Sequence, residues 1–217
     1  PYFAYARTDK KDQPRVPITA RLIADCIEVA GADRILTLDL HAGQIMGFFK
    51  LPGDELTALY ILSNYLRELD IPDLVVVGAD TGIAKRARNF AERLDAPLAI
   101  IEKRRIGNDS TVEALNVIGE VEGRNVVIFD DEADTAGSLQ QAAIAVQKRG
   151  ARDIYAAVTH AVLSSNAVQR IEDSPIKRLV VTDTIPLPPE KRSPKIEVLS
   201  IAPLLGEAIR RIHLNKS

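Results

Sequence analysis

The sequence predicts an α/β fold, with a mostly parallel sheet covered by helices on both faces. Short apolar runs alternate along the chain with amphipathic segments of helical spacing. The runs at 74–78 and 126–129 are almost entirely apolar, which is typical of strands that are buried on both faces. The segments between strands are long enough for helical crossovers, so successive strands are expected to be parallel and connected with a right-handed sense.

The expected elements follow from these patterns and from glycine and proline punctuation. Strands are expected at 35–38, 74–78, 98–101, 115–119, 126–129, 154–159, 179–182 and 196–199. Helices are expected at 17–30, 55–69, 83–94, 139–148, 164–171 and 202–212. The segment from Pro186 to Pro194 carries four prolines and is expected to be irregular.

Composition excludes several classes of function. The 217 residues are 46% hydrophobic and 27% charged, which suits a globular protein with a buried core. The net charge of -2 gives no general attraction to nucleic acid. Cys26 is the only cysteine, so no intrachain disulfide can form, which favours the cytoplasm, and its apolar surroundings predict a core position. No apolar run approaches the roughly 20 residues of a membrane span.

Residues 126–138 are the most informative stretch. An apolar strand, Val126 to Phe129, leads into paired acids and then into the small or polar residues Asp134, Thr135, Ala136, Gly137 and Ser138 before a helix. Asp130 and Asp131 can accept hydrogen bonds from sugar hydroxyls, and amides at a helix N-terminus bind anions. A phosphorylated sugar would satisfy both parts. The alternative is that Asp134 or Ser138 merely caps the helix.

Three more polar loops follow expected strands, where ligands gather in parallel sheets. The loop at 39–44 carries His41, and the loop at 78–82 carries Asp80 between Gly78 and Gly82, whose amides could face a diphosphate. After the strand at 98–101 come Lys103, Arg104 and Arg105. Lys103 and Arg105 alternate along an extended backbone, so they point the same way and could together neutralise negative charge.

Together these strings resemble the ribose-phosphate diphosphokinase family, whose product is phosphoribosyl diphosphate (PRPP). The matches are Tyr-Ala-Arg-x-Asp-Lys-Lys-Asp from Tyr5, Asp-Leu-His-x-x-Gln-Ile-x-Gly-Phe-Phe from Asp39, Asp80, Lys-Arg-Arg from Lys103, and the PRPP-binding motif at 126–138. The chain departs from the family pattern at Thr8 (usually glutamine), Gly78 and Ala79 (Ser-Pro), Ile83 and Ala136 (glycine) and Ser138 (threonine).

The resemblance implies transfer of the β,γ-diphosphoryl group of Mg-ATP to the anomeric hydroxyl of ribose 5-phosphate, giving PRPP and AMP. It assigns ATP to Arg7, Thr8 and His41, and Mg²⁺ to His41 and Asp80. It assigns ribose 5-phosphate to Arg105, Asp130 and the loop Asp134, Thr135, Ala136, Gly137 and Ser138. Lys103 and Arg105 would stabilise the transition state. No general base is evident, so catalysis is expected to rest on positioning and charge neutralisation.

The family fold implies two phosphoribosyltransferase-like domains. Residues 1–52 would be the remainder of the first, with 203–217 packing back on it, and residues 53–202 would form the second. Because residues 2–6 resemble the end of a strand whose partners lie upstream, the chain is expected to be a fragment. The family also implies a homo-oligomer built from dimers, with a hexamer as the full assembly.

Two alternative functions remain open from the sequence. A phosphoribosyltransferase would share the motif at 126–138 but consume PRPP, and a noncatalytic regulatory homologue would bind without turnover. His160 and His213 are expected to be structural residues, and Ser164 and Ser165 are expected to cap a helix.

Overall fold

The computed structural model describes residues 1–11, 14–105 and 113–216, and for 103–105, 113 and 114 it describes the backbone alone. The chain forms two compact units, Pro1–Ala58 and Leu59–Ser217, and each has its own hydrophobic core. The packing of 203–217 against the first part of the chain stays a prediction.

The first unit is built on a short parallel strand pair. Its elements are α1 (Thr19–Val29), β1 (Ile35–Leu38), the 3-10 helix η1 (Gly43–Phe48) and β2 (Gly53–Leu56). β1 and β2 pair from Ile35 with Gly53 to Leu38 with Leu56. The expected helix over 55–69 is therefore wrong at its start, because residues 53–56 pair with β1 as a strand and the helix begins only at Leu59. Residues 4–7 form turns, with the Ala6 amide donating to the Phe3 carbonyl at 3.0 Å, and the Leu38 amide of β1 donates to the Pro1 carbonyl at 3.1 Å.

Two alanines set the buried face of α1. Ala20 and Ala24 are fully buried, whereas Leu22 is 52% exposed and Cys26 is exposed. Residues four apart share a helix face, so a face set by Ala20 and Ala24 excludes position 22 and leaves position 26 at the surface. The expectation that Cys26 belongs to the core is therefore wrong.

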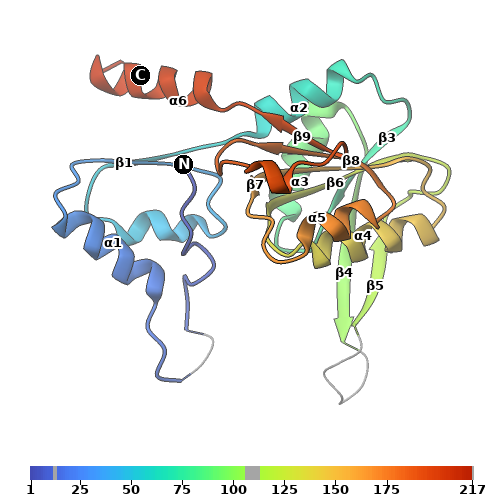
Figure 1. Ribbon diagram of the computed structural model, residues 1–217, viewed down its shortest axis with the longest axis horizontal. Helices are drawn as coiled ribbons and strands as arrows, with labels where there is room; N and C mark the ends of the chain where they lie inside the picture. Colours follow the sequence, from blue (N-terminus) through green and yellow to red (C-terminus); the bar gives the residue numbers. More distant parts are fainter. Residues whose placement is uncertain (12–13, 106–112, 217) are drawn as a thin grey trace. The chain divides into compact units, whose positions relative to one another are not determined.

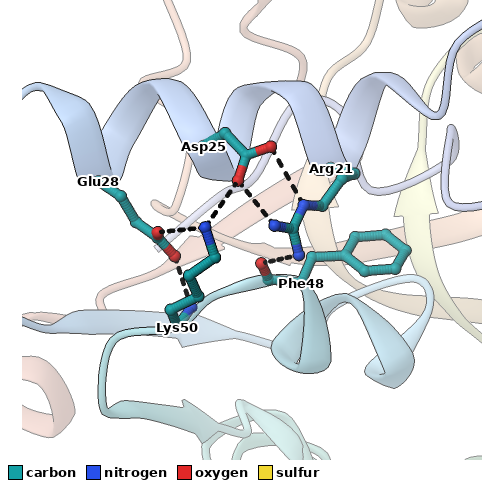
Figure 2. A network of polar contacts seen from close by, with 5 residues as sticks. All are labelled: Arg21, Asp25, Glu28, Phe48 and Lys50. Atoms are coloured by element: carbon teal, nitrogen blue, oxygen red, sulfur yellow. Dashed lines mark hydrogen bonds and ion pairs between the residues drawn. The ribbon is translucent and has the colours of Figure 1, made fainter.

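A polar network fastens α1 to the end of η1, as Figure 2 shows. The Arg21 guanidinium donates to both carboxylate oxygens of Asp25, at 3.1 and 2.8 Å, and to the Phe48 carbonyl at 2.8 Å. The Lys50 amide donates to Glu28 Oε1 at 2.5 Å, and its ammonium lies 3.9 Å from Asp25 and Glu28. These contacts hold the last part of the 39–49 motif against the helix.

The second unit is a seven-stranded sheet with helices (Figure 1). Its elements are α2 (Leu59–Glu68), β3 (Leu74–Gly78), α3 (Ala84–Leu94), β4 (Leu98–Arg105), β5 (Glu113–Ile118), β6 (Asn125–Ala133), α4 (Gly137–Lys148), β7 (Ile154–Ala161), α5 (Ala167–Glu172), β8 (Ile176–Thr182), the 3-10 helix η2 (Pro189–Lys191), β9 (Ile196–Leu199) and α6 (Ala202–His213). The strand order is β5-β4-β3-β6-β7-β8-β9, and every neighbouring pair is parallel except β4 with β5.

Helices cover both faces of this sheet, as the sequence predicts. Val126 and Ile128 of β6 pack in one core with residues of α4 such as Val146. Phe129, which points to the opposite face, stacks on Phe90 of α3 with ring centroids 4.4 Å apart. The alternation along β6 therefore fills two separate interfaces, and the central strand is buried on both sides.

Among the strands that are longer than expected, β4 and β6 change the site. β4 continues through Arg105 and pairs antiparallel with β5, so Lys103 lies opposite Leu115 and Arg105 opposite Glu113. β6 continues to Ala133, so the acidic pair lies on the strand and not in a loop. Within the part of the chain that the structure describes, no helix is long and apolar enough to cross a membrane.

Candidate functional site

Three carboxylates, those of Asp80, Asp130 and Asp131, gather where β3 ends beside β6. Gly78 pairs with Phe129 across the two strands, and the Ala79 amide donates to the Phe129 carbonyl at 3.1 Å. Asp80 and Asp130 therefore follow at the same edge. Desolvation by burial raises the pKa of Asp130 well above its usual range, and the nearby charges of Asp131 and Asp80 raise it further.

Asp130 and Asp131 have different surroundings. Successive strand residues point to opposite faces, so Asp131 shares the face of Phe129 and α3. Asp131 is buried, and its Oδ2 lies 4.0 Å from Nη1 of Arg86 on α3. The Asp131 amide also donates to Asp130 Oδ1 at 2.9 Å. Asp131 is thus committed to α3, which leaves Asp130 as the acid suited to a sugar hydroxyl.

The loop after β6 leaves its amides available to an anion. Ala136, at the N-terminus of α4, has a left-handed backbone with φ 58°, and no side-chain hydrogen bond caps this helix end. Among the described residues, none accepts a hydrogen bond from the amides of Thr135, Ala136 or Gly137. The loop therefore keeps donors for a phosphate, whether or not Asp134 or Ser138 also caps the helix.

Residues after β7, including one on α5, donate hydrogen bonds to the carbonyls of this loop. The Leu163 amide donates to the Ala133 carbonyl at 3.0 Å, and the Ser164 amide donates to the Asp134 carbonyl at 2.9 Å. The Ser164 hydroxyl also donates to Asp134 Oδ1 at 2.5 Å, and Nη1 of Arg170 donates to the Thr135 carbonyl at 2.9 Å. We call these three residues, Leu163, Ser164 and Arg170, the clasp.

Sequence reasoning missed the clasp. It assigned Ser164 and Ser165 to a helix cap, but α5 begins at Ala167, its N-cap is Asn166, and no side-chain hydrogen bond caps it. Arg170 lies 35 positions from its partner Thr135. No local pattern marks a contact of that span, because an arginine on a short helix looks like any solvated residue. His160 is buried, with Nδ1 3.0 Å from Thr184 Oγ1, as expected of a structural residue.

The loop after β3 is organised around Asp80. The amides of Gly82 and Ile83 donate to Asp80 Oδ1 at 2.7 and 3.1 Å. The expectation that the Gly82 amide faces a diphosphate is therefore wrong. Ile83 has a right-handed backbone with φ -83°, so its branched side chain causes no strain where the family has glycine. A Cβ at position 78, where the family has serine, would lie 2.8 Å from the end of the Ile100 side chain, so that side chain would have to shift.

Lys103 and Arg105 are placed only by their backbone. They end β4, the parallel neighbour of β3, so they lie toward the carboxyl edge that also carries Asp80. Their side chains, and residues 106–112, lie outside what the structure describes.

In the first unit, the structure joins two of the motif loops. Nε2 of Gln44 donates to Asp9 Oδ2 at 2.5 Å, which links the loop at 39–44 to the stretch that carries Arg7 and Thr8. Arg7, Thr8 and His41 are all exposed.

The strand pair supports the base of this loop. The Leu40 amide donates to Glu55 Oε1 at 3.0 Å, and the Ala58 amide donates to Asp39 Oδ2 at 2.9 Å. The Glu55 side chain of β2 and the Ala58 amide therefore fix the backbone of the two residues before His41.

No group of three or more histidine, cysteine or acidic residues that could hold a metal ion is found within residues 1–11, 14–105 and 113–216. His41 belongs to the first unit and Asp80 to the second. The carboxylate of Asp80 by itself suits Mg²⁺, because that ion commonly keeps several waters and binds through one or two carboxylates together with substrate phosphates.

Comparison with known proteins gives consistent matches along the chain. Residues 107–217 match the family described as "Phosphoribosyl synthetase-associated domain", and residues 1–31 match "N-terminal domain of ribose phosphate pyrophosphokinase". The ribose-phosphate pyrophosphokinase of Oceanobacillus iheyensis is 52% identical over a match that covers 98% of this chain and 67% of that protein. The ribose-phosphate pyrophosphokinase of Listeria ivanovii is 53% identical over a match that covers 100% of this chain and 68% of that protein. A crystal structure of phosphoribosylpyrophosphate synthetase from Mycobacterium smegmatis superposes with a TM-score of 0.92 at 42% identity, covering 99% of this chain and 70% of that one.

Proposed function

The chain belongs to the ribose-phosphate pyrophosphokinase family, and from this premise we propose that it transfers the β,γ-diphosphoryl group of ATP to ribose 5-phosphate. The anomeric hydroxyl is the acceptor, and the products are PRPP and AMP. The observation that carries the proposal is the loop at 134–138, which lies next to Asp130. The amides of residues 135–137 in this loop donate no hydrogen bond to any described residue.

Ribose 5-phosphate is assigned to the second unit. The 5-phosphate accepts hydrogen bonds from the loop Asp134, Thr135, Ala136, Gly137 and Ser138, where the amides and the dipole of α4 favour an anion. Asp130 accepts hydrogen bonds from the ribose hydroxyls, which compensate its burial. Arg105 is assigned a further contact to the same substrate, from the end of β4.

ATP is assigned to residues of the first unit. The guanidinium of Arg7 can stack on adenine and form paired hydrogen bonds with phosphate, and Thr8 and His41 complete the contacts. Mg²⁺ is assigned to Asp80 and His41, directly or through water, with Asp80 Oδ2 as its oxygen because Oδ1 accepts two amides. Bound with ATP, the ion supplies neutralisation of phosphoryl charge.

Catalysis is assigned to Lys103 and Arg105. Both cations neutralise charge that develops on the oxygens of the transferring group, and such neutralisation usually lowers the barrier to phosphoryl transfer more than any other effect. No side chain is assigned as general base, so the reaction depends on holding the two substrates in line. We further propose a cytoplasmic homo-oligomer that requires no nucleic acid or membrane.

The test is an assay of AMP release from Mg-ATP that depends on ribose 5-phosphate. We expect turnover by the chain, and Lys103→Ala should lower kcat by about a hundredfold or more, as loss of a transition-state contact does. Binding of ribose 5-phosphate should stay within about twofold, because Lys103 acts after binding.

Other results would favour the alternatives. Binding of both substrates without any AMP release would favour a noncatalytic homologue, and loss of PRPP that depends on a nucleobase would favour a phosphoribosyltransferase. Unchanged turnover in Lys103→Ala would remove this lysine from the proposed chemistry.

A further inference from the structure

The clasp contacts three consecutive carbonyls of the phosphate loop. The carbonyls of Ala133 and Asp134 accept hydrogen bonds from the amides of Leu163 and Ser164, at 3.0 and 2.9 Å. The carbonyl of Thr135 accepts one from Nη1 of Arg170, at 2.9 Å. Of these three contacts, only the last comes from a side chain, so it alone can be removed by substitution without breaking a backbone pair.

The direction of each carbonyl fixes the direction of the next amide. In a trans peptide the C=O and N–H bonds of one planar unit point to opposite sides. No peptide bond among the described residues is cis. The carbonyl of Thr135 points to Arg170, so the amide of Ala136 points away from Arg170, toward the side on which we place the 5-phosphate. Arg170 thereby sets the orientation of a donor that it does not touch.

The same contact opposes a local strain. Ala136 holds a left-handed backbone that costs a residue with a Cβ about 1–2 kcal/mol. The next position is also close to the guanidinium, since a Cβ added to Gly137 would lie 3.5 Å from Nη1 of Arg170. Without the hydrogen bond from Arg170, the Thr135–Ala136 peptide could rotate, and rotation would turn the Ala136 amide out of the site.

We propose that Arg170 is a positioning residue for the 5-phosphate loop, acting through the Thr135 carbonyl to hold the Ala136 amide toward the substrate. This inference rests on the proposed function and extends it to a residue on α5. The effect is on binding of the phosphorylated sugar and not on the chemical step. Ser164 supports the same loop through Asp134, but its amide contact survives any side-chain change.

The test compares Arg170→Met, which keeps the aliphatic stem but removes the donor and the charge, with Arg149→Met. Arg149 is a matched control because its Nη2 also donates to a backbone carbonyl, that of Val117, at 3.1 Å, on a different part of the sheet. Calorimetric titration with ribose 5-phosphate should give a Kd raised about tenfold in Arg170→Met, as expected when a charge-assisted contact is lost. The Kd for ATP should be unchanged.

Kinetics and a conservative variant distinguish positioning from stability. In Arg170→Met the KM for ribose 5-phosphate should rise with kcat within about threefold, and Arg170→Lys, which keeps a cationic donor, should recover affinity. A loss that lysine does not restore, or that Arg149→Met shares, would overturn the inference in favour of a purely structural role. If Arg170→Met binds ribose 5-phosphate as tightly as the wild-type chain does, this inference alone is overturned. A wild-type chain that fails to bind ribose 5-phosphate would overturn the proposed function with it.

Discussion

At the scale of single residues, Ala136 combines a left-handed backbone with a buried methyl group, and it is 4% exposed. Ala136→Gly should raise the free energy of unfolding by about 1–2 kcal/mol, because the backbone strain is relieved. It should also lower this free energy by about 0.8 kcal/mol through the lost burial of a methyl group and by about 0.4–1 kcal/mol through the greater freedom of the unfolded chain. The gain and the losses nearly cancel. The free energy of unfolding, measured in urea, should therefore stay within about 1 kcal/mol of the wild-type value.

Ala142 provides the matched control, because it is equally buried but lies in the interior of α4. There glycine costs about 1 kcal/mol of helix propensity and about 0.8 kcal/mol of methyl burial, with no strain to relieve. Ala142→Gly should lower the free energy of unfolding by about 2 kcal/mol. Equal losses in the two variants would show that the backbone of Ala136 is not strained.

Asp130 should make stability depend on pH. Its pKa is raised in the folded state by burial and by the charge of Asp131, so the folded protein binds this proton more tightly than the unfolded chain. Below the unfolded pKa of about 3.9 the carboxyl carries no penalty in either state. The penalty grows as pH rises toward the folded pKa and is complete above it. Asp130→Asn should therefore raise the free energy of unfolding at pH 8, by about 0.5–2 kcal/mol.

This gain should shrink as the pH is lowered toward 4, and urea unfolding at several pH values measures it. Asp73→Asn is a suitable control, because Asp73 lies at the surface, 2.8 Å from Nη2 of Arg152. It should lose about 0.2–1 kcal/mol, as exposed ion pairs do. A gain in Asp130→Asn that is the same at pH 4 and pH 8 would contradict the assignment to charge.

At the scale of elements, the hydrogen bond from Gln44 to Asp9 joins the loops proposed to bind ATP. Gln44→Ala removes the donor, so both loops gain freedom that ATP binding must then restrict. We expect the Kd for ATP to rise about three- to tenfold, with ribose 5-phosphate affinity unchanged, by calorimetry. Arg34→Gln, which removes an exposed pair with Asp54 in the same unit, should leave both affinities unchanged. A similar loss in both variants would contradict a specific role for Gln44.

The sequence predicts elements best where an apolar run meets clear punctuation. The strands at 35–38, 74–78 and 196–199 have the expected bounds. β2 and the outer half of β4 were missed because Gly-Asp-Glu-Leu and Lys-Arg-Arg carry no strand pattern, and both depend on pairing with a partner strand. The motifs predict which loops form the site, but the clasp arises from contacts about 30 residues apart, which no local pattern records.

At the scale of the whole molecule, the proposed contacts divide between the two units. The residues assigned to ribose 5-phosphate, and the clasp behind them, belong to Leu59–Ser217, whereas Arg7, Thr8 and His41 belong to Pro1–Ala58. The second unit has its own sheet and core, so residues 59–217 alone should fold cooperatively. They should bind ribose 5-phosphate with a Kd within about threefold of the full chain, while ATP affinity falls about a hundredfold, equivalent to about 2.7 kcal/mol.

Calorimetry on residues 59–217 beside the full chain measures both affinities, and Arg170→Met in the shorter piece provides the internal control. If the sugar phosphate is held only by the second unit, this substitution should weaken binding by the same factor in both lengths, since independent contacts give additive free energies. A shorter piece that folds but binds ribose 5-phosphate more than tenfold more weakly would mean that residues 1–58 contribute directly to that site. The division of substrates between the units would then be wrong, even if the enzyme assignment stands.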